Sequence, residues 1–203
     1  MIKILSKILS YLFHPLLMTT WFTLLLLYTN PFSFAGLSSG IVIAVVFINT
    51  FMFPAISILL MRKLGFIEDL EMPDHKQRII PLVASIIFYV WAYLATRKIN
   101  FPYMMGVFMM GVLVSLFASF VINVFYKVSL HMVGVSGALT AIMLLVFVSP
   151  SDLSYYFLAM ILLTGAVASA RLYLGAHTMK EVYVGFLVGM FGQVFGLFLF
   201  HPR

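Results

Sequence analysis

The chain has 203 residues, of which 64% are hydrophobic and only 9% are charged. Its mean hydropathy is +1.13, whereas about a quarter of the residues in a soluble domain are charged. The sequence therefore predicts an integral membrane protein. Cysteine is absent, which excludes disulfides and thiolate metal sites. The basic residues are scattered among apolar runs and form no basic stripe, so we expect no nucleic-acid partner.

Apolar stretches of about twenty residues follow one another along the chain, and this is the length that a helix needs to cross a bilayer. Backbone polar groups in lipid must be bonded within the structure, so we expect helices. The expected spans are 8–28, 40–61, 79–97, 102–126, 132–149, 153–171 and 179–200. The fold class predicted is an all-α polytopic membrane bundle of about seven transmembrane helices (six to seven), in one integral membrane domain over 1–203.

The first span begins after a basic N-terminus that contains Lys3 and Lys7. No small-residue cleavage site follows, so residues 8–28 are expected to form an uncleaved span. His14 lies at the edge of this span, before Pro15, and is expected to be an interface histidine without a role.

Three polar segments interrupt the apolar pattern, at 62–78, 127–131 and 171–181. Two spans separate each segment from the next, so all three are expected on one side of the membrane. Ionisable groups at membrane depth are costly and are functional candidates by default. One composite polar site is the natural hypothesis.

The segment 171–181 reads "RLYLGAHTMKE". Gly175 is expected to end a helix near Arg171, and His177 and Glu181 are four residues apart at the start of the last span. This spacing places both on one helical face. Glu181 is then able to accept a hydrogen bond from one imidazole nitrogen and leave the other to act as a nucleophile. The alternative is an interface histidine and a glutamate that favours the first turn.

The segment 127–131 places Lys127, Ser129 and His131 at alternate positions as a new span begins. Ser129 and backbone N–H groups at a helix start can hold phosphate oxygens. Lys127 adds positive charge, and His131 is a candidate proton donor to a leaving group. The alternative makes Ser129 an N-cap and Lys127 an interface lysine.

The segment 62–78 ends in "MPDHKQR", where Lys76 and Arg78 are candidate phosphate ligands. The alternative is a charged loop that anchors the next span. Four of the six acidic residues also lie here, which suggests a divalent metal held together with phosphate. No second acidic cluster exists elsewhere in the sequence. The acids are Glu68, Asp69, Glu71 and Asp74.

Arg171, His177 and Glu181, in this order and spacing, resemble the third motif of the type-2 phosphatidic-acid phosphatase superfamily. Ser129-Leu130-His131 is similar to that family's serine-glycine-histidine motif, and residues 74–81 are similar to its basic first motif. The resemblance covers roughly 74–195, the expected phosphatase-like core, and its three motifs occur in family order.

The resemblance implies a membrane phosphatase that hydrolyses a lipid phosphomonoester or diphosphate without metal or other cofactor. His177 would attack phosphorus and form a phosphohistidine, Glu181 would orient it, and His131 would protonate the leaving oxygen. The remaining residues would stabilise the charge on the equatorial oxygens. These are Arg171, Arg78, Lys76 and Ser129, with Lys127 added from its placement.

The sequence departs from the family at four places. Glu181 replaces the usual aspartate, Ala170 replaces the serine before the arginine, and Leu130 replaces the glycine of the second motif. Pro81 also comes three residues after Arg78 instead of next to it. These departures favour a second hypothesis, a catalytically inactive lipid-binding or transport protein of the same fold. The acidic run supports a third, a metal-dependent enzyme of prenyl diphosphates.

The expected location is a multi-pass protein of the plasma membrane, or of the inner membrane if bacterial. Under the predicted topology nine of the twelve basic residues share the side of the N-terminus. Four of the nine are candidate site cations, and the remaining five against three leave the orientation open under the positive-inside rule. The lipid substrate and the oligomeric state stay open as well.

Overall fold

The computed structural model describes residues 1–30, 34, 36–70, 72, 74–99, 101–149 and 151–200. Over these residues the regular structure is entirely helical. The α-helices are α1 (Ile2–Leu12), α2 (Pro15–Thr29), α3 (Ser39–Phe47), α4 (Phe53–Lys63), α5 (Ile79–Lys98), α6 (Tyr103–Phe125), α7 (Leu130–Val148), α8 (Ser154–Tyr173) and α9 (Met179–Leu199). A π-helical turn, η2 (Ile48–Met52), joins α3 to α4, and a 3-10 turn, η3 (Lys76–Arg78), precedes α5.

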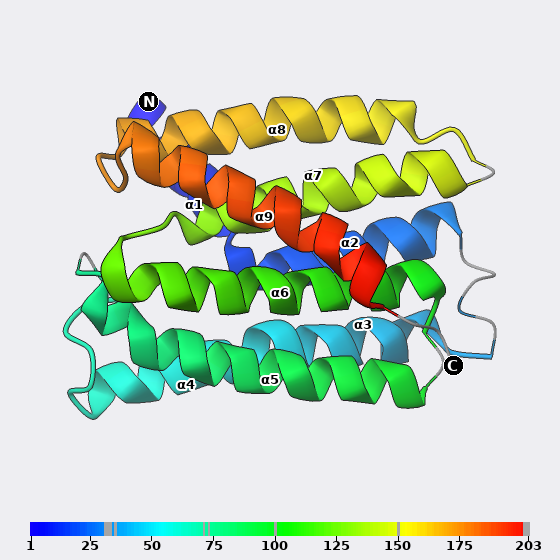
Figure 1. Cartoon of the computed structure of the whole chain (residues 1–203), viewed down its shortest axis with the longest axis horizontal. Helices are drawn as coiled ribbons and strands as arrows, with labels where there is room; N and C mark the ends of the chain where they lie inside the picture. Colours follow the sequence, from blue (N-terminus) through cyan, green and yellow to red (C-terminus); the bar gives the residue numbers. More distant parts are fainter. Residues whose placement is uncertain are drawn as a thin grey trace.

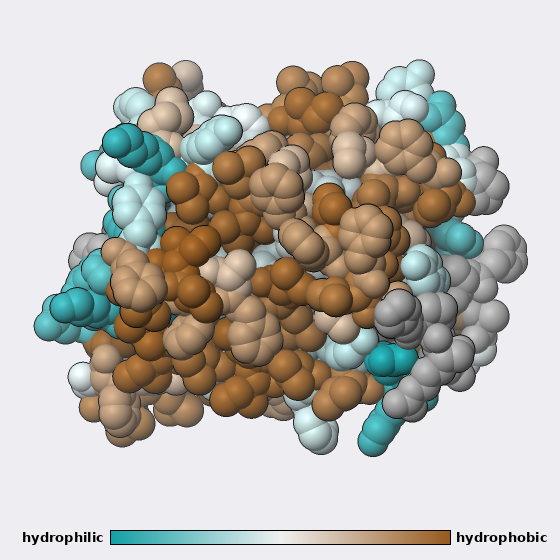
Figure 2. Space-filling model, viewed as in Figure 1, coloured by the Kyte–Doolittle hydropathy of each residue, from teal (hydrophilic) through white to brown (hydrophobic). Residues whose placement is uncertain are grey.

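Six helices in the described part of the chain are long and apolar enough to cross a membrane. They are Ser39–Lys63, Lys76–Lys98, Tyr103–Phe125, Leu130–Val148, Ser154–Tyr173 and Met179–Leu199. The count becomes seven if α1 and α2 together form one broken span. The expected all-helical fold is therefore confirmed, and six to seven helical segments in the described residues are long and apolar enough to be the expected spans. Figure 2 shows the matching surface, apolar over the middle of the visible face with polar residues towards its two ends.

The first span differs from the continuous helix expected over 8–28. It is broken at His14, and α1 and α2 meet at an angle of 67°. The residue before a proline is driven out of the helical region, and His14 has an extended backbone with ψ of 139°. Pro15 then opens α2 at a position where its missing N–H costs nothing. The hydropathy of the sequence does not show this break, because the residues on both sides of it are apolar.

Helix α9 crosses the bundle in contact with α6 and α7 (Figure 1). Glycines line its contact face, and no side chain of ordinary size fits at these positions. A Cβ at Gly189 would overlap the Ser136 hydroxyl, and one at Gly192 would overlap the Ser115 hydroxyl. Small residues allow such close approach in membrane bundles. At the start of α9, Gly185 lies against the Ser129 carbonyl in the same way.

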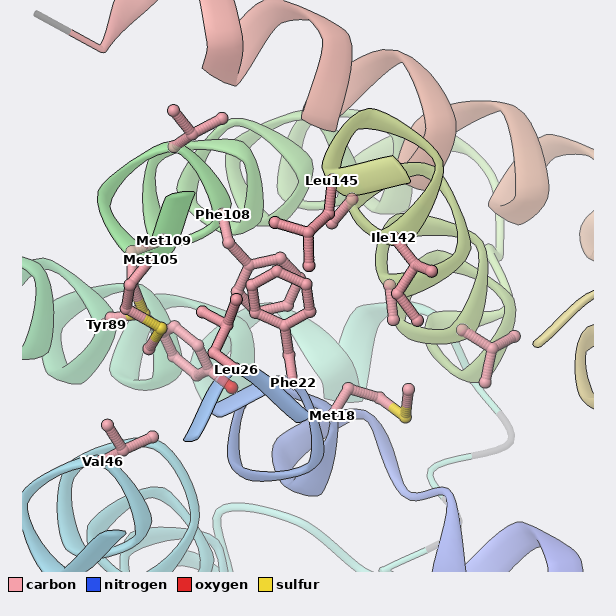
Figure 3. Packing of buried hydrophobic residues seen from close by; sticks show 14 of the residues in the cluster. Met18, Phe22, Leu26, Val46, Tyr89, Met105, Phe108, Met109, Ile142 and Leu145 are labelled. Atoms are coloured by element: carbon pink, nitrogen blue, oxygen red, sulfur yellow. The ribbon is translucent and has the colours of Figure 1, made fainter. Parts of the chain in front are cut away.

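The core lies where α2 meets α5, α6 and α7. Phe22 of α2 stacks on Phe108 of α6 with ring centroids 4.0 Å apart, and the Tyr89 hydroxyl of α5 lies 3.3 Å from the hydroxyl of Thr19 (Figure 3). These contacts tie the N-terminal helices to the bundle that carries the three polar segments.

Candidate functional site

The three polar segments gather at one end of the bundle, the end at the left of Figure 1. Among the hydrogen bonds that join them are two from side chains. The Lys127 ammonium donates to the Ala176 carbonyl at 3.0 Å, and the Arg78 guanidinium donates to the Val128 carbonyl at 3.1 Å. Residues 49 and 50 positions apart in the chain are therefore in contact. We call Arg78, Lys127, Arg171, His177 and Glu181, which act on one another here, the polar cluster.

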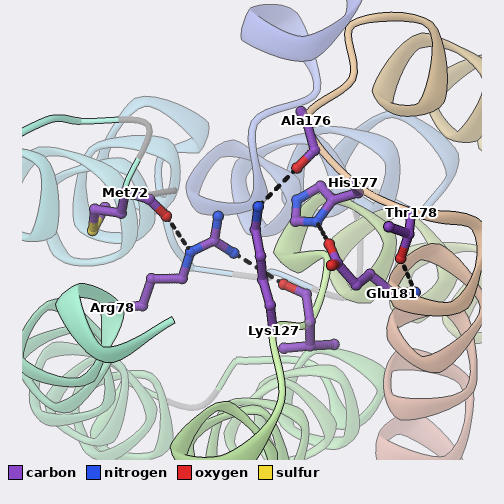
Figure 4. A network of polar contacts seen from close by, with 8 residues as sticks. Met72, Arg78, Lys127, Ala176, His177, Thr178 and Glu181 are labelled. Carbon is purple, nitrogen blue, oxygen red and sulfur yellow. Dashed lines mark hydrogen bonds and ion pairs between the residues drawn. The ribbon is translucent and has the colours of Figure 1, made fainter. Parts of the chain in front are cut away.

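His177 and Glu181 form a close polar pair in this cluster. The Nδ1 atom of His177 lies 2.6 Å from a carboxylate oxygen of Glu181 (Figure 4). Gly175, with φ of 66°, turns the chain after α8, and Thr178 then caps α9 by accepting a hydrogen bond from the Glu181 N–H. A carboxylate can only accept, so Nδ1 donates and Nε2 keeps the lone pair. The imidazole thus has one nitrogen oriented and the other able to act as a nucleophile.

The His177 side chain is only 2% exposed. Burial lowers its pKa to about 4, against the raising effect of the Glu181 hydrogen bond and with the help of positive charge on Arg78, Arg171 and Lys127. The imidazole is therefore neutral at pH 7, the state in which Nε2 can attack an electrophile.

Three cations act on His177 from three different segments. Arg78 is buried and is fixed by two carbonyl oxygens, those of Met72 at 2.8 Å and Val128. Lys127 comes from the loop before α7, and Arg171 from the last turn of α8. Figure 4 shows Arg78, Lys127 and His177 directed towards a common space. Around His177, these three cations and the one carboxylate of Glu181 leave an excess of positive charge that suits a multiply charged anion.

The charges of this cluster also act on Lys127. Its pKa is lowered from the usual value, first by burial, then by Arg78 and more weakly by Arg171, while Glu181 raises it. Concentrated positive charge of this kind is relieved when an anion binds.

The segment that carries Arg78 is held by a pair of hydrogen bonds that the sequence did not reveal. Asn123, fully buried near the end of α6, donates from Nδ2 to the His75 carbonyl at 2.6 Å. The His75 ring nitrogen Nδ1 lies 2.9 Å from the Asn123 carbonyl. This reciprocal pair positions the turn from which the Arg78 guanidinium extends. An isolated asparagine at the end of an apolar run carries no sequence signal for such a role.

Ser129 lies at the N-cap position of α7, as the alternative reading expected, but its side chain makes no capping hydrogen bond. The residue is fully buried, and its hydroxyl has no hydrogen-bond partner within the described part of the chain. Its backbone N–H donates to the Glu181 carbonyl at 3.3 Å. A buried hydroxyl without a partner is costly, which favours a ligand oxygen as its partner.

His131, the candidate proton donor, contacts the first two helices. Its Nε2 lies 3.0 Å from the Ser10 carbonyl of α1, and its ring stands edge-on to that of His14, with centroids 5.4 Å apart. The bend between α1 and α2 places His14, which was expected to be an interface histidine without a role, beside His131. His14 Nδ1 accepts a hydrogen bond from the Leu16 N–H.

The remaining sequence candidates lie outside the cluster. The Lys76 side chain is exposed, and the cations that act on His177 do not include it. Of the acidic run, Glu68 accepts a hydrogen bond from Gln77 and Asp74 accepts one from the Lys76 N–H. Glu71 lies outside the described residues. In the described part of the chain, no three side chains of the metal-binding types come together.

No family model, no curated protein and no solved structure matches this chain.

Proposed function

We propose that this chain is an integral membrane phosphatase that removes phosphate from a lipid phosphomonoester or diphosphate, with the phosphatase-like core in 74–195. The observation that carries the proposal is the 2.6 Å contact between His177 Nδ1 and Glu181, inside a cluster to which Arg78, Lys127 and Arg171 supply positive charge. The apolar helices that carry the cluster support a substrate with a hydrocarbon tail in a bilayer and its phosphate at the bilayer surface.

In the proposed reaction, Nε2 of His177 attacks phosphorus while Nδ1–H stays bonded to Glu181, which stabilises the imidazolium that forms. The bond from phosphorus to the leaving oxygen breaks, and that oxygen takes a proton from His131 or from water. Water then attacks the phosphohistidine and gives one proton back to the group that protonated the leaving oxygen, so that phosphate, neutral His177 and the restored proton donor result. Arg78, Arg171 and Lys127 stabilise the charge on the equatorial oxygens in both steps. Ser129 adds a hydroxyl donor.

The test is phosphate release by the protein purified in detergent, with phosphatidate as substrate and a chelator present. We expect turnover that is abolished in His177→Ala and retained in Lys76→Ala, a matched control at a cation outside the cluster. Full activity of His177→Ala would contradict the proposal. Dependence on added Mg²⁺ would favour the metal-dependent prenyl-diphosphate enzyme instead.

A second candidate function, lipid binding without chemistry, has one observation in its favour. The proposed proton donor His131 directs Nε2 at the Ser10 carbonyl, 3.0 Å away, and must leave this contact to reach a leaving oxygen. Saturable binding of phosphatidate without turnover, over a panel of lipid phosphates and diphosphates, would favour this candidate.

A further inference from the structure

An apolar cavity of about 210 Å³ lies between α2, α7 and α8. Its walls include Met18 and Phe22 of α2, Ala138 and Ile142 of α7, and Ala159 of α8. Figure 3 shows Met18 and Phe22 on the side of α2 that faces Ile142. Dry cavities of about 150 Å³ with such walls bind benzene, so this one has room for a stretch of hydrocarbon. A helix, about 10 Å wide, does not fit.

One wall of the cavity begins close to His131, at the polar end of the bundle. Phe13, at the bend between α1 and α2, lines it, and the next residue is His14, whose ring touches that of His131. Along α7, Ala138 and Ile142 lie about 10 and 16 Å below His131 at 1.5 Å per residue. Along α8, Met160 lies about 16 Å below Arg171 by the same measure. A ligand with an anionic head at the cations and one extended tail spans these positions.

The cavity also reaches the lipid-facing surface of the bundle. Two of its wall residues, Trp21 and Tyr156, are 39% and 37% exposed, and Ala159 is exposed on the outer face of α8. The Trp21 indole is fixed by a hydrogen bond from Nε1 to the Leu12 carbonyl at 3.0 Å. The wall is thus held in place, and a tail is able to enter sideways from the bilayer.

We infer that this cavity binds one acyl or prenyl tail of the lipid whose phosphate occupies the cluster of Arg78, Lys127 and Arg171. The inference rests on the proposed function for the identity of the head group. It adds that contact between the hydrocarbon tail and Ala159 contributes to substrate recognition, so that the protein distinguishes substrates by tail length.

The first test compares dipalmitoyl with dioctanoyl phosphatidate. In Ala159→Phe the new ring occupies the mouth of the cavity, and we expect the ratio of kcat/KM for long over short tails to fall about tenfold, the effect of losing contact with about two methylene groups. Leu158→Phe, on the neighbouring exposed position of α8, should leave this ratio unchanged. An unchanged ratio in Ala159→Phe would overturn the inference.

The second test needs no turnover. A phosphatidate with a photoreactive diazirine in its tail is crosslinked to the full chain in phosphatidylcholine nanodiscs, and the labelled peptides are identified by mass spectrometry. We expect labelling near Trp21 and Tyr156 that unlabelled phosphatidate suppresses. Labelling there without any phosphatase activity would keep the cavity and remove the proposed function. Labelling that phosphatidate does not suppress, or that is equally strong near the exposed Trp91 of α5, would mean ordinary bilayer contact and contradict the inference.

Discussion

Glu181 holds the Nδ1 atom of His177 at 2.6 Å, and the two side chains are only 13% and 2% exposed. The acid lies one helical turn beyond the histidine, on α9, and the close packing of α9 at Gly185 fixes where that turn lies. The glutamate side chain, one methylene longer than aspartate, reaches the imidazole directly.

Replacing Glu181 tests the orienting role directly. In Glu181→Gln the amide no longer stabilises the imidazolium, and we expect kcat to fall by about 10²- to 10⁴-fold, as for the loss of an acid or base. KM for phosphatidate should change much less. Glu181→Asp retains the charge on a shorter side chain, and its kcat should lie between those of the wild type and Glu181→Gln. Equal activity of all three proteins would show that the contact has no catalytic role.

The proton donor is tested with two leaving groups. Nitrophenolate leaves without a proton, whereas an alkoxide does not. We therefore expect the kcat of His131→Ala to fall about 10²-fold or more with phosphatidate as substrate. With a nitrophenyl phosphate its kcat should change little. The measurement is steady-state phosphate release on both substrates. A similar loss on both would indicate that His131 supports the structure through its contacts with Ser10 and His14 instead of donating a proton.

The pH dependence follows from the His177 pKa of about 4. Protonation removes the Nε2 lone pair, so kcat/KM should hold from neutral pH down to about pH 5 and fall as the pH passes through the pKa. Lys127 contributes to lowering this pKa, and its removal should raise it. In Lys127→Met the acid limb of the plot of kcat/KM against pH should therefore move to higher pH, and kcat/KM should also be lower throughout. A limb that stays in place would contradict the assignment of this titration to His177.

The glycines of α9 should be intolerant of any side chain. In Gly189→Ala the new Cβ overlaps the Ser136 hydroxyl and the Val133 carbonyl. We expect the free energy of unfolding to fall by about 1–3 kcal/mol. Gly165 of α8 is the matched control, because a Cβ there meets nothing within 4 Å. Gly165→Ala should be neutral or stabilising by up to about 1 kcal/mol. Thermal unfolding in detergent measures both, and equal melting temperatures would refute the packing argument.

The helices and the shared location of the three polar segments were predictable from the sequence. Span length is set by the bilayer, and the number of crossings between segments then decides the side. The contact of His177 with Glu181 at the start of α9 was also predictable, because residues four apart lie on one helical face.

What the sequence did not reveal depends on contacts between distant residues. His131 meets Ser10 across 121 positions, and it does so because the chain bends at His14, which hydropathy does not register. Lys76 and Arg78 looked equivalent in sequence. The 3-10 turn directs one into solvent and buries the other, where carbonyls of Met72 and Val128 hold it. Asn123 acts only through the backbone of His75.

The most direct test of the central claim is to trap the covalent intermediate. Purified protein is mixed with phosphatidate, quenched in base, in which a phosphohistidine survives, and digested for mass spectrometry. The account predicts one phosphoryl group on His177 that disappears when the substrate is exhausted, and none on His131. Steady phosphate release with no phosphoryl group on His177 at any time would contradict it.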